Sequence, residues 1–431
     1  SYTFGPQQSR MEFPRRVFDG EGVRGDVDFG PTLMLNRQRC IMCTRCARFM
    51  RDVEGDAQIN VINRGYGSEI GTFEDQGVHS LMSGNLMDVC PVGAITTKDY
   101  RFKSRPWDNP DAADTICTMC SKGCNTTAWL RAKPEWAKGS RLIRVTPRLN
   151  PEVNGYWMCD IGRFGYHWVE GEDRLKHPLV RTASGAQEAV SWHDVLPRLR
   201  DKLVEVGRST PDGVRFLLSA HGAVEELFVF RRLTEELLGA DGPNAITIAW
   251  TSSTKPRPEH ATFTIAETDA PNVRGAEILG LTQAAEGATR LAALRAAVER
   301  GAVSALYVFD PGPAGSLGDV SWIAAARSTG LLRMLVVQAV VQSPLAQTAD
   351  FVLPGAAWVE KEAAHVNDQG RLQGTARAVA PPADAREDCA ILIDLASALG
   401  VQLPYQDAAG IRRDIAVRFH GVDAFHSLAT M

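Results

Sequence analysis

Cysteines are the residues of this chain best suited to chemistry, and their distribution is uneven. Eight of the nine lie within the first 159 of 431 residues. They form two groups, and in each group three closely spaced thiols are followed much later by a fourth. Thiolates are the usual ligands of iron–sulfur clusters and of structural zinc. The spacing within each group therefore indicates which metal centre it suits.

The first group is Cys40, Cys43 and Cys46 at C-x2-C-x2-C spacing, with Cys90 directly before Pro91. Three thiolates at this spacing wrap one corner of an iron–sulfur cube, and a distant Cys-Pro supplies the remaining ligand, as in bacterial ferredoxins. Zinc prefers paired C-x2-C knuckles, and a disulfide framework needs an oxidising compartment and usually a small scaffold. The pattern predicts one 4Fe–4S cluster in a ferredoxin-like fold.

Arginines surround the first group in the sequence. Positive charge beside a cluster favours its reduced form, so one hypothesis is that these side chains raise its reduction potential. The alternative is an ordinary solvated surface. The five residues are Arg37, Arg39, Arg45, Arg48 and Arg51.

The second group is Cys117, Cys120 and Cys124 at C-x2-C-x3-C spacing, followed by Cys159. The looser interval favours a second 4Fe–4S cluster but leaves a structural zinc as an alternative, which spacing alone does not exclude. Cys389 lies far downstream beside an apolar segment, where a cysteine usually acts as a small buried hydrophobe.

The elements that position these thiols differ along the chain. Residues 1–110 are loop-rich, residues 111–180 hold the second group, and residues 181–431 alternate between helical and strand-like patterns. We expect three domains at these boundaries, and the alternation favours an α/β domain with a parallel sheet. Helices are expected near 192–203, 224–238, 288–300, 319–328 and 389–399, and strands near 214–218, 245–250, 305–309 and 334–340.

Composition excludes several classes of protein. A net charge of −4 provides no basic surface for nucleic acid or an anionic membrane, so we expect no nucleic-acid partner. No apolar run approaches the roughly 18 residues that a membrane span needs, so we expect no direct membrane span. The best stretch, residues 331–341, contains Arg333 and Gln338 and is predicted to be a buried strand.

Several strings of the sequence resemble a known family. They include YTFGPQQSRMEFPRRVFD, LNRQRCIMCTRCARF, GNLMDVCPVGAIT, CTMCSKGC, DRLKHPLVR, DAPNVRGAEILG and ADFVLPGAAWVEKEAAHVNDQGRLQ. These strings are similar to the large iron–sulfur subunit of NADH-quinone oxidoreductase, which belongs to the peripheral arm of respiratory complex I. They extend from residue 2 to about residue 375 and so cover most of the chain.

The resemblance implies a role for each cysteine. Cys40, Cys43, Cys46 and Cys90 would hold a 4Fe–4S cluster that passes electrons from NADH and FMN toward quinone. A second quartet found in some members, apart from the main electron path, would correspond to Cys117, Cys120, Cys124 and Cys159. The chain would be an electron-transfer subunit of an oxidoreductase (translocase), not catalytic alone.

The resemblance also implies partners and a location. The partners would be the flavoprotein NADH-binding subunit and the quinone-proximal iron–sulfur subunits of the peripheral arm. The complex would place the chain on the cytoplasmic side of the bacterial inner membrane.

Two departures from the family pattern stand out. Members begin with a region that carries a 2Fe–2S cluster and a 4Fe–4S cluster held by one histidine and three cysteines, and this sequence lacks it. We expect an incomplete sequence or a split subunit, with the 2Fe–2S cluster only in the missing region. The interval before Cys159 is also long, with an insertion near residues 132–140.

The region from residue 181 resembles the molybdopterin oxidoreductase fold in a degenerate form. The alternative function is a catalytic molybdopterin oxidoreductase of the formate dehydrogenase class, which needs a Cys, selenocysteine or Ser on the metal. After the motif-like stretch at residues 219–233, residues 249–254 read AWTSST, without a cysteine. Ser252 or Ser253 is a formal alternative ligand. We expect no molybdenum. A zinc-bearing scaffold without redox function is the third hypothesis.

Overall fold

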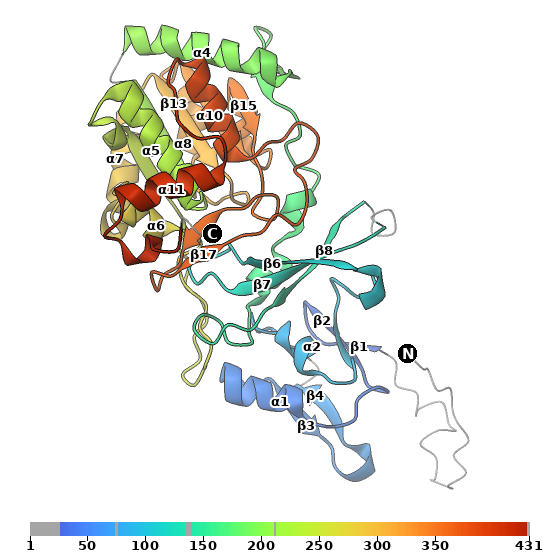
Figure 1. Cartoon of the computed structure of the whole chain (residues 1–431). Helices are drawn as coiled ribbons and strands as arrows, with labels where there is room; N and C mark the ends of the chain where they lie inside the picture. The colour runs from blue at the N-terminus through green and yellow to red at the C-terminus, as the bar shows by residue number, and fades with distance from the viewer. Residues whose placement is uncertain (1–25, 74–75, 134–138, 211–212, 429–431) are drawn as a thin grey trace. The chain divides into compact units, whose positions relative to one another are not determined.

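The computed structural model describes residues 26–73, 76–133, 139–210 and 213–428 (Figure 1). The chain forms two compact units. Of the described residues, the first unit takes those up to residue 110 together with 131–165 and 255–265. The second unit takes 111–130, 166–254 and those from 266 onward. The string at residues 2–19 lies outside the described residues, as does part of the insertion near 132–140.

The first unit is built from short elements joined by loops. A three-stranded antiparallel sheet has the order β1-β2-β5, with Val27 opposite Leu35 and Leu33 opposite Thr97. A separate hairpin pairs β3 with β4. The strands are β1 (Asp26–Asp28), β2 (Leu33–Asn36), β3 (Ile59–Ile62), β4 (Glu69–Thr72), β5 (Ile95–Thr97) and β8 (Leu142–Pro147). The helices are α1 (Arg45–Phe49), its π-helical continuation η1 (Met50–Glu54), α2 (Asn85–Val89) and α3 (Asp160–Phe164), with short 3-10 turns η2 (Gly65–Gly67) and η4 (Pro106–Asp108).

The second unit contains a seven-stranded sheet of order β10-β9-β15-β14-β13-β11-β12. Its five strands from β15 to β12 are parallel, and β9 and β10 pair antiparallel. The strands are β9 (Leu179–Arg181), β10 (Gln187–Ala189), β11 (Val214–Ser219), β12 (Ile246–Ala249), β13 (Ala305–Asp310), β14 (Met334–Ala339) and β15 (Phe351–Pro354). The parallel α/β sheet expected from the sequence is therefore confirmed.

Helices cover both faces of this sheet because its strands are apolar on both sides. Alternate residues of β11 and β13 point to opposite faces, so Phe216 and Tyr307 join one core while Leu217 and Leu306 join the other. The first core is closed by α4 (Trp192–Ser209), α5 (Val224–Leu238), α6 (Val273–Ile278), α10 (Asp388–Ala398) and α11 (Ala408–Arg418). The second is closed by α7 (Gly287–Glu299), α8 (Ser321–Ser328) and α9 (Pro344–Thr348).

Two further hairpins in the second unit carry residues used below. One pairs β6 (Asp111–Ile116) with β7 (Asn125–Leu130), and the other pairs β16 (Ala364–Val366) with β17 (Leu372–Gly374). Single 3-10 turns complete the unit: η6 (His167–Glu170), η8 (Gly242–Ala245), η9 (Ala284–Glu286) and η10 (Asp423–Phe425).

Candidate iron–sulfur sites

Cys40 and Cys43 lie in a loop that leaves β2, and Cys46 lies in the first turn of α1, which follows this loop. The side chain of Asn36 accepts hydrogen bonds from the backbone N–H groups of Gln38 and Arg39, which turns the chain at the end of the strand. Met42 (φ 56°) and Thr44 (φ 59°) then adopt left-handed backbone, which is uncommon for residues with a Cβ. This tight curl keeps the three cysteines within one short segment.

The fourth cysteine reaches the same place from α2. Cys90 is the C-cap residue of α2, where the backbone becomes extended before Pro91. Pro91 cannot continue the helix, since it lacks an N–H and restricts the residue before it. Gly93 follows with a φ of 61°, and the chain then enters β5.

All four cysteines of the first group line one pocket of about 350 Å³, open solvent included. The rest of its wall is mostly apolar, with Leu35, Ile70, Ala94 and Ile95 among its residues. Burial, together with the charges of the other three cysteines, raises the pKa of the Cys46 thiol to about 11. The structure thus brings together the residues predicted for the first cluster, in largely apolar surroundings that suit soft thiolate ligands.

The arginines around this pocket are not equivalent. Arg37 forms an ion pair with Glu69 at 3.3 Å and Arg51 one with Asp52 at 2.6 Å. Arg45 is exposed and lines the pocket itself. Arg48 donates to the Cys43 carbonyl at 3.4 Å, and Arg45 is the one of the five arginines that lines the pocket.

A buried network anchors the segment that carries Cys90. Asp160 accepts hydrogen bonds from the Ser83 hydroxyl (2.5 Å) and the Gly84 N–H (2.8 Å). Arg163 donates to Asn85 at 3.1 Å and to Asp88 at 2.6 Å, and its side chain is only 3% exposed. Asp160 and Arg163 were not predicted from the sequence, because nothing near Cys90 in the chain marks them as partners of this segment.

The tip of the β6–β7 hairpin carries three cysteines of the second group. The Cys117 N–H donates to the Cys124 carbonyl at 2.8 Å, so the hairpin pairing extends beyond the strands. Cys117, Cys120 and Cys124 are all buried, and burial raises the pKa of the Cys120 thiol. Cys159 is buried too, but it belongs to the first unit, where it is the N-cap residue of α3.

Residues of the β16–β17 hairpin hold this loop in place. The Asp368 N–H donates to the Ser121 carbonyl at 2.9 Å, and the Asn367 amide donates to the Lys122 carbonyl at 3.2 Å. The Ser121 N–H donates to the Thr268 carbonyl at 3.0 Å. The hairpin belongs to a string that carries the family resemblance, but its role at the cysteine loop was not predicted.

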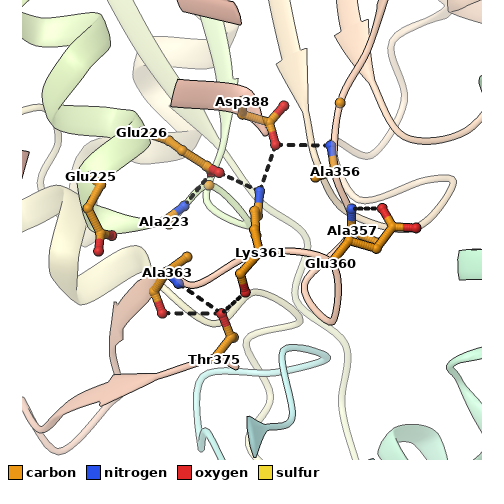
Figure 2. Close-up of polar contacts among 12 residues, drawn as sticks. Ala223, Glu225, Glu226, Ala356, Ala357, Glu360, Lys361, Ala363, Thr375 and Asp388 are labelled. Atoms are coloured by element: carbon orange, nitrogen blue, oxygen red, sulfur yellow. Dashed lines mark hydrogen bonds and ion pairs between the residues drawn. The ribbon is translucent and has the colours of Figure 1, made fainter. Parts of the chain in front are cut away.

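The second unit also buries an ion cluster, which Figure 2 shows. The Lys361 ammonium contacts the carboxylate of Glu226 and lies 2.7 Å from that of Asp388. Asp388 also accepts from the Gln338 amide at 2.8 Å, and Tyr307 donates to Gln338 at 2.6 Å. Burial raises the pKa of Glu226 to about 7. The members of the cluster satisfy one another, which is typical of buried structural charges.

The two serines named as alternative molybdenum ligands both have partners within the second unit. Ser252 forms an isolated bridge with Thr268, and the Ser253 hydroxyl donates to Asp269 at 2.7 Å. Cys389 is half-buried at the start of α10, and burial raises the pKa of its thiol well above the ordinary value. In the described part of the chain, no three His, Cys, Asp or Glu side chains converge on a single-ion position.

Two family models match separate parts of the chain. Residues 30–96 match the ferredoxin-like domain of NADH-quinone oxidoreductase subunit 3. Residues 244–398 match molybdopterin oxidoreductase. The first match covers the first cysteine group, and the second covers much of the parallel sheet.

Curated relatives agree with the first match. An NADH-quinone oxidoreductase subunit of Streptomyces coelicolor is 38% identical over 192 residues, which is 44% of this chain and 21% of that protein. NADH-quinone oxidoreductase subunit 3 of Thermus thermophilus is 39% identical over 200 residues, 46% of this chain and 24% of that protein. The mitochondrial NADH dehydrogenase [ubiquinone] iron-sulfur protein 1 of Solanum tuberosum is 35% identical over 220 residues, 51% of this chain and 28% of that protein.

A solved structure, acetylene hydratase from Pelobacter acetylenicus, matches 72% of each chain at 13% identity with a TM-score of 0.46, too low to support an inference. The curated relatives are matched over less than a third of their own length. Within those bounds, this chain is similar to NADH-quinone oxidoreductase subunits, and it combines a ferredoxin-like domain with a molybdopterin oxidoreductase domain.

Proposed function

We propose that this chain relays electrons in the peripheral arm of an NADH:quinone oxidoreductase through a 4Fe–4S cluster bound by Cys40, Cys43, Cys46 and Cys90. The observation that carries the proposal is that these four cysteines line one largely apolar pocket within the ferredoxin-like match. Electrons would come from NADH and FMN and leave toward quinone. The chain would contribute to the oxidoreductase without being catalytic alone.

A bound 4Fe–4S cluster supplies one-electron redox chemistry, and the protein decides its potential and access. Leu35, Ile70 and Ile95 give the pocket an apolar wall, and the four thiols would provide the ligands. Arg45 supplies positive charge at the pocket wall, which would favour the reduced form. The Asp160–Arg163 network holds the segment that ends at Cys90.

The second quartet, Cys117, Cys120, Cys124 and Cys159, would hold a second 4Fe–4S cluster with a structural role apart from the main path. The buried hairpin loop of the first three supports this. The inclusion of Cys159 rests on its spacing in the sequence and on the family resemblance. Zinc is the alternative metal for this quartet.

The proposed partners are a flavoprotein NADH-binding subunit and iron–sulfur subunits nearer the quinone. The names of the relatives support a place in such a complex. No helix of the described segments is both long and apolar enough to span a membrane. We place the chain on the cytoplasmic side of a bacterial inner membrane, held there by the complex.

The test compares two cysteine substitutions in the assembled complex. Cys40→Ala should abolish electron flow from NADH to quinone, while Cys117→Ala should leave it intact if the complex assembles. Assembly is checked by subunit composition, and flavin reduction by NADH is the internal control because it precedes this chain. Normal electron flow in an assembled Cys40→Ala complex would refute the proposal.

The second candidate function is a catalytic molybdopterin oxidoreductase, which the match of residues 244–398 brings into consideration. Ser252 and Ser253 are the alternative metal ligands in the stretch considered, and the Ser253 hydroxyl is hydrogen-bonded to Asp269. Molybdenum and pterin content of the purified protein decides between the candidates. Stoichiometric molybdenum with bound pterin would favour this second function.

A further inference from the structure

The β6–β7 hairpin, whose tip carries the Cys117–Cys124 loop, and the β16–β17 hairpin both contain buried polar groups that have no hydrogen-bond partner among the described residues. They are the hydroxyls of Thr115 and Thr126, Nδ1 of His365 and both amide atoms of Gln373. These residues are at most 7% exposed. An unsatisfied buried polar group costs about 1–3 kcal/mol, and native proteins contain few of them. Three of these residues, Thr115, Thr126 and Gln373, lie beside the cysteine loop and point to a ligand that accepts hydrogen bonds there.

The threonines lie on the cysteine-bearing face of the first hairpin. Thr115 is directly opposite Thr126 in the β6–β7 pairing. Thr115 precedes Cys117 by two residues and Thr126 follows Cys124 by two, and the Cys117–Cys124 hydrogen bond continues the same register. Because residues two apart in a strand point the same way, the two hydroxyls share a face with the two thiols.

Gln373 approaches the same loop from the second hairpin. It is opposite His365 in the β16–β17 pairing. A Cβ added to Gly123 would lie 2.4 Å from Gln373 Oε1, so the glutamine amide packs directly against the loop between Cys120 and Cys124. Gly123 has a φ of 64°, which favours glycine for a second reason.

The chemistry of the donor set suits sulfur. A 4Fe–4S cube presents sulfide as well as thiolate sulfurs, and both accept hydrogen bonds. Gln373 carries two amide N–H groups, and a half-turn of its amide exchanges nitrogen and oxygen without a change of shape. An N–H···S hydrogen bond stabilises the more negative, reduced cluster and so raises its reduction potential.

We propose that Gln373 is a positioning and tuning residue that donates an amide N–H···S hydrogen bond to a 4Fe–4S cluster held by the Cys117–Cys124 loop. This proposal deepens the proposed function and rests on it, because it requires an iron–sulfur cluster, and not zinc, at this loop. It assigns a role to a residue of the second unit that is not itself a ligand.

The experiment is a potentiometric titration of the full, anaerobically purified chain, followed by paramagnetic resonance. Cys120→Ala identifies the signal of the second cluster by its loss. Gln373→Met keeps a side chain of similar length without an N–H, and its second-cluster midpoint potential should become more negative. Gln369→Leu, at an exposed position of the same hairpin, is the matched control and should leave the potential unchanged.

A second readout follows the hydrogen bond itself. After exchange into deuterated water, pulsed resonance of the wild-type cluster should show a coupled exchangeable deuteron that Gln373→Met lacks. If Gln373→Met does not fold, Gln373→Glu replaces it; its carboxylate should also shift the potential to more negative values.

The outcomes separate this inference from the proposed function. An unchanged potential and deuteron coupling in a folded, fully loaded Gln373 variant would overturn the inference while the second cluster stands. Iron and sulfide equivalent to one cube, with zinc in the remaining site, would overturn the inference and the second-cluster proposal together.

Discussion

Arg163 offers the sharpest test of how the fold positions Cys90. Its side chain is 3% exposed and donates to Asp88 at 2.6 Å and to Asn85 at 3.1 Å. Breaking a buried ion pair from one side costs about 3–5 kcal/mol. Because Asp88 is 28% exposed and regains some hydration, we expect Arg163→Met to cost about 2–3 kcal/mol of local stability.

That cost translates into faster loss of the first cluster. If the cluster escapes through local opening of the Cys90 segment, a loss of about 2–3 kcal/mol raises the open population about 30- to 150-fold, at about 1.4 kcal/mol per tenfold. The assay is the rate at which a strong iron chelator bleaches the cluster absorbance. The first-cluster resonance signal, recorded during the same reaction, separates its loss from that of any second cluster.

Arg144 provides the matched control, because it lies 3.5 Å from the other carboxylate oxygen of Asp88 with 27% of its side chain exposed. Such a pair contributes about 0–1 kcal/mol, so Arg144→Met should accelerate release by less than about fivefold. Equal release rates for the two variants, or a wild-type rate for Arg163→Met, would refute the view that the buried network holds the Cys90 segment.

Three further predictions concern charge. Burial raises the pKa of Glu54 to about 8, so the folded chain holds a proton that the unfolded chain loses above about pH 4.5. The free energy of unfolding should therefore fall as pH rises from about 4.5 to about 8, by up to about 5 kcal/mol at about 1.4 kcal/mol per pKa unit. Glu54→Gln should flatten the dependence of the melting temperature on pH across this range. Lys361→Met should lower the free energy of unfolding by about 3–5 kcal/mol, because two buried carboxylates lose the ammonium between them. The measurement is the calorimetric melting temperature of the second unit, which should fall. An unchanged melting temperature would contradict the structural role of this buried ion cluster. Arg45→Glu should make the first cluster's midpoint potential more negative than Arg51→Glu does, since only Arg45 of the two lines the pocket, and equal shifts in a redox titration would reject the local effect.

The second unit was largely predictable from the sequence because its elements are long and strongly patterned. The predicted run at 214–218 is β11, and that at 334–340 is β14. Helix α4 extends to Ser209, beyond the predicted end at 203, because Val206 continues its buried stripe. The fold follows from apolar periodicity, a local property that sequence displays directly.

The candidate first site could be proposed from the sequence for a different reason, since its four cysteines are one residue type at fixed spacing. The residues that support it were not predictable. Asp160 and Arg163 lie more than 70 positions from the residues they hold, and nothing local in the sequence marks such pairs. Gln373 was hidden in the same way, because its proximity to Gly123 arises from the packing of two hairpins.

The most direct test of the electron-relay role is a low-temperature paramagnetic resonance spectrum of the dithionite-reduced, anaerobically purified chain, with iron and sulfide analysis of the same sample. We expect a 4Fe–4S signal that disappears in Cys40→Ala and persists in Cys117→Ala. A silent spectrum together with negligible iron would contradict this role.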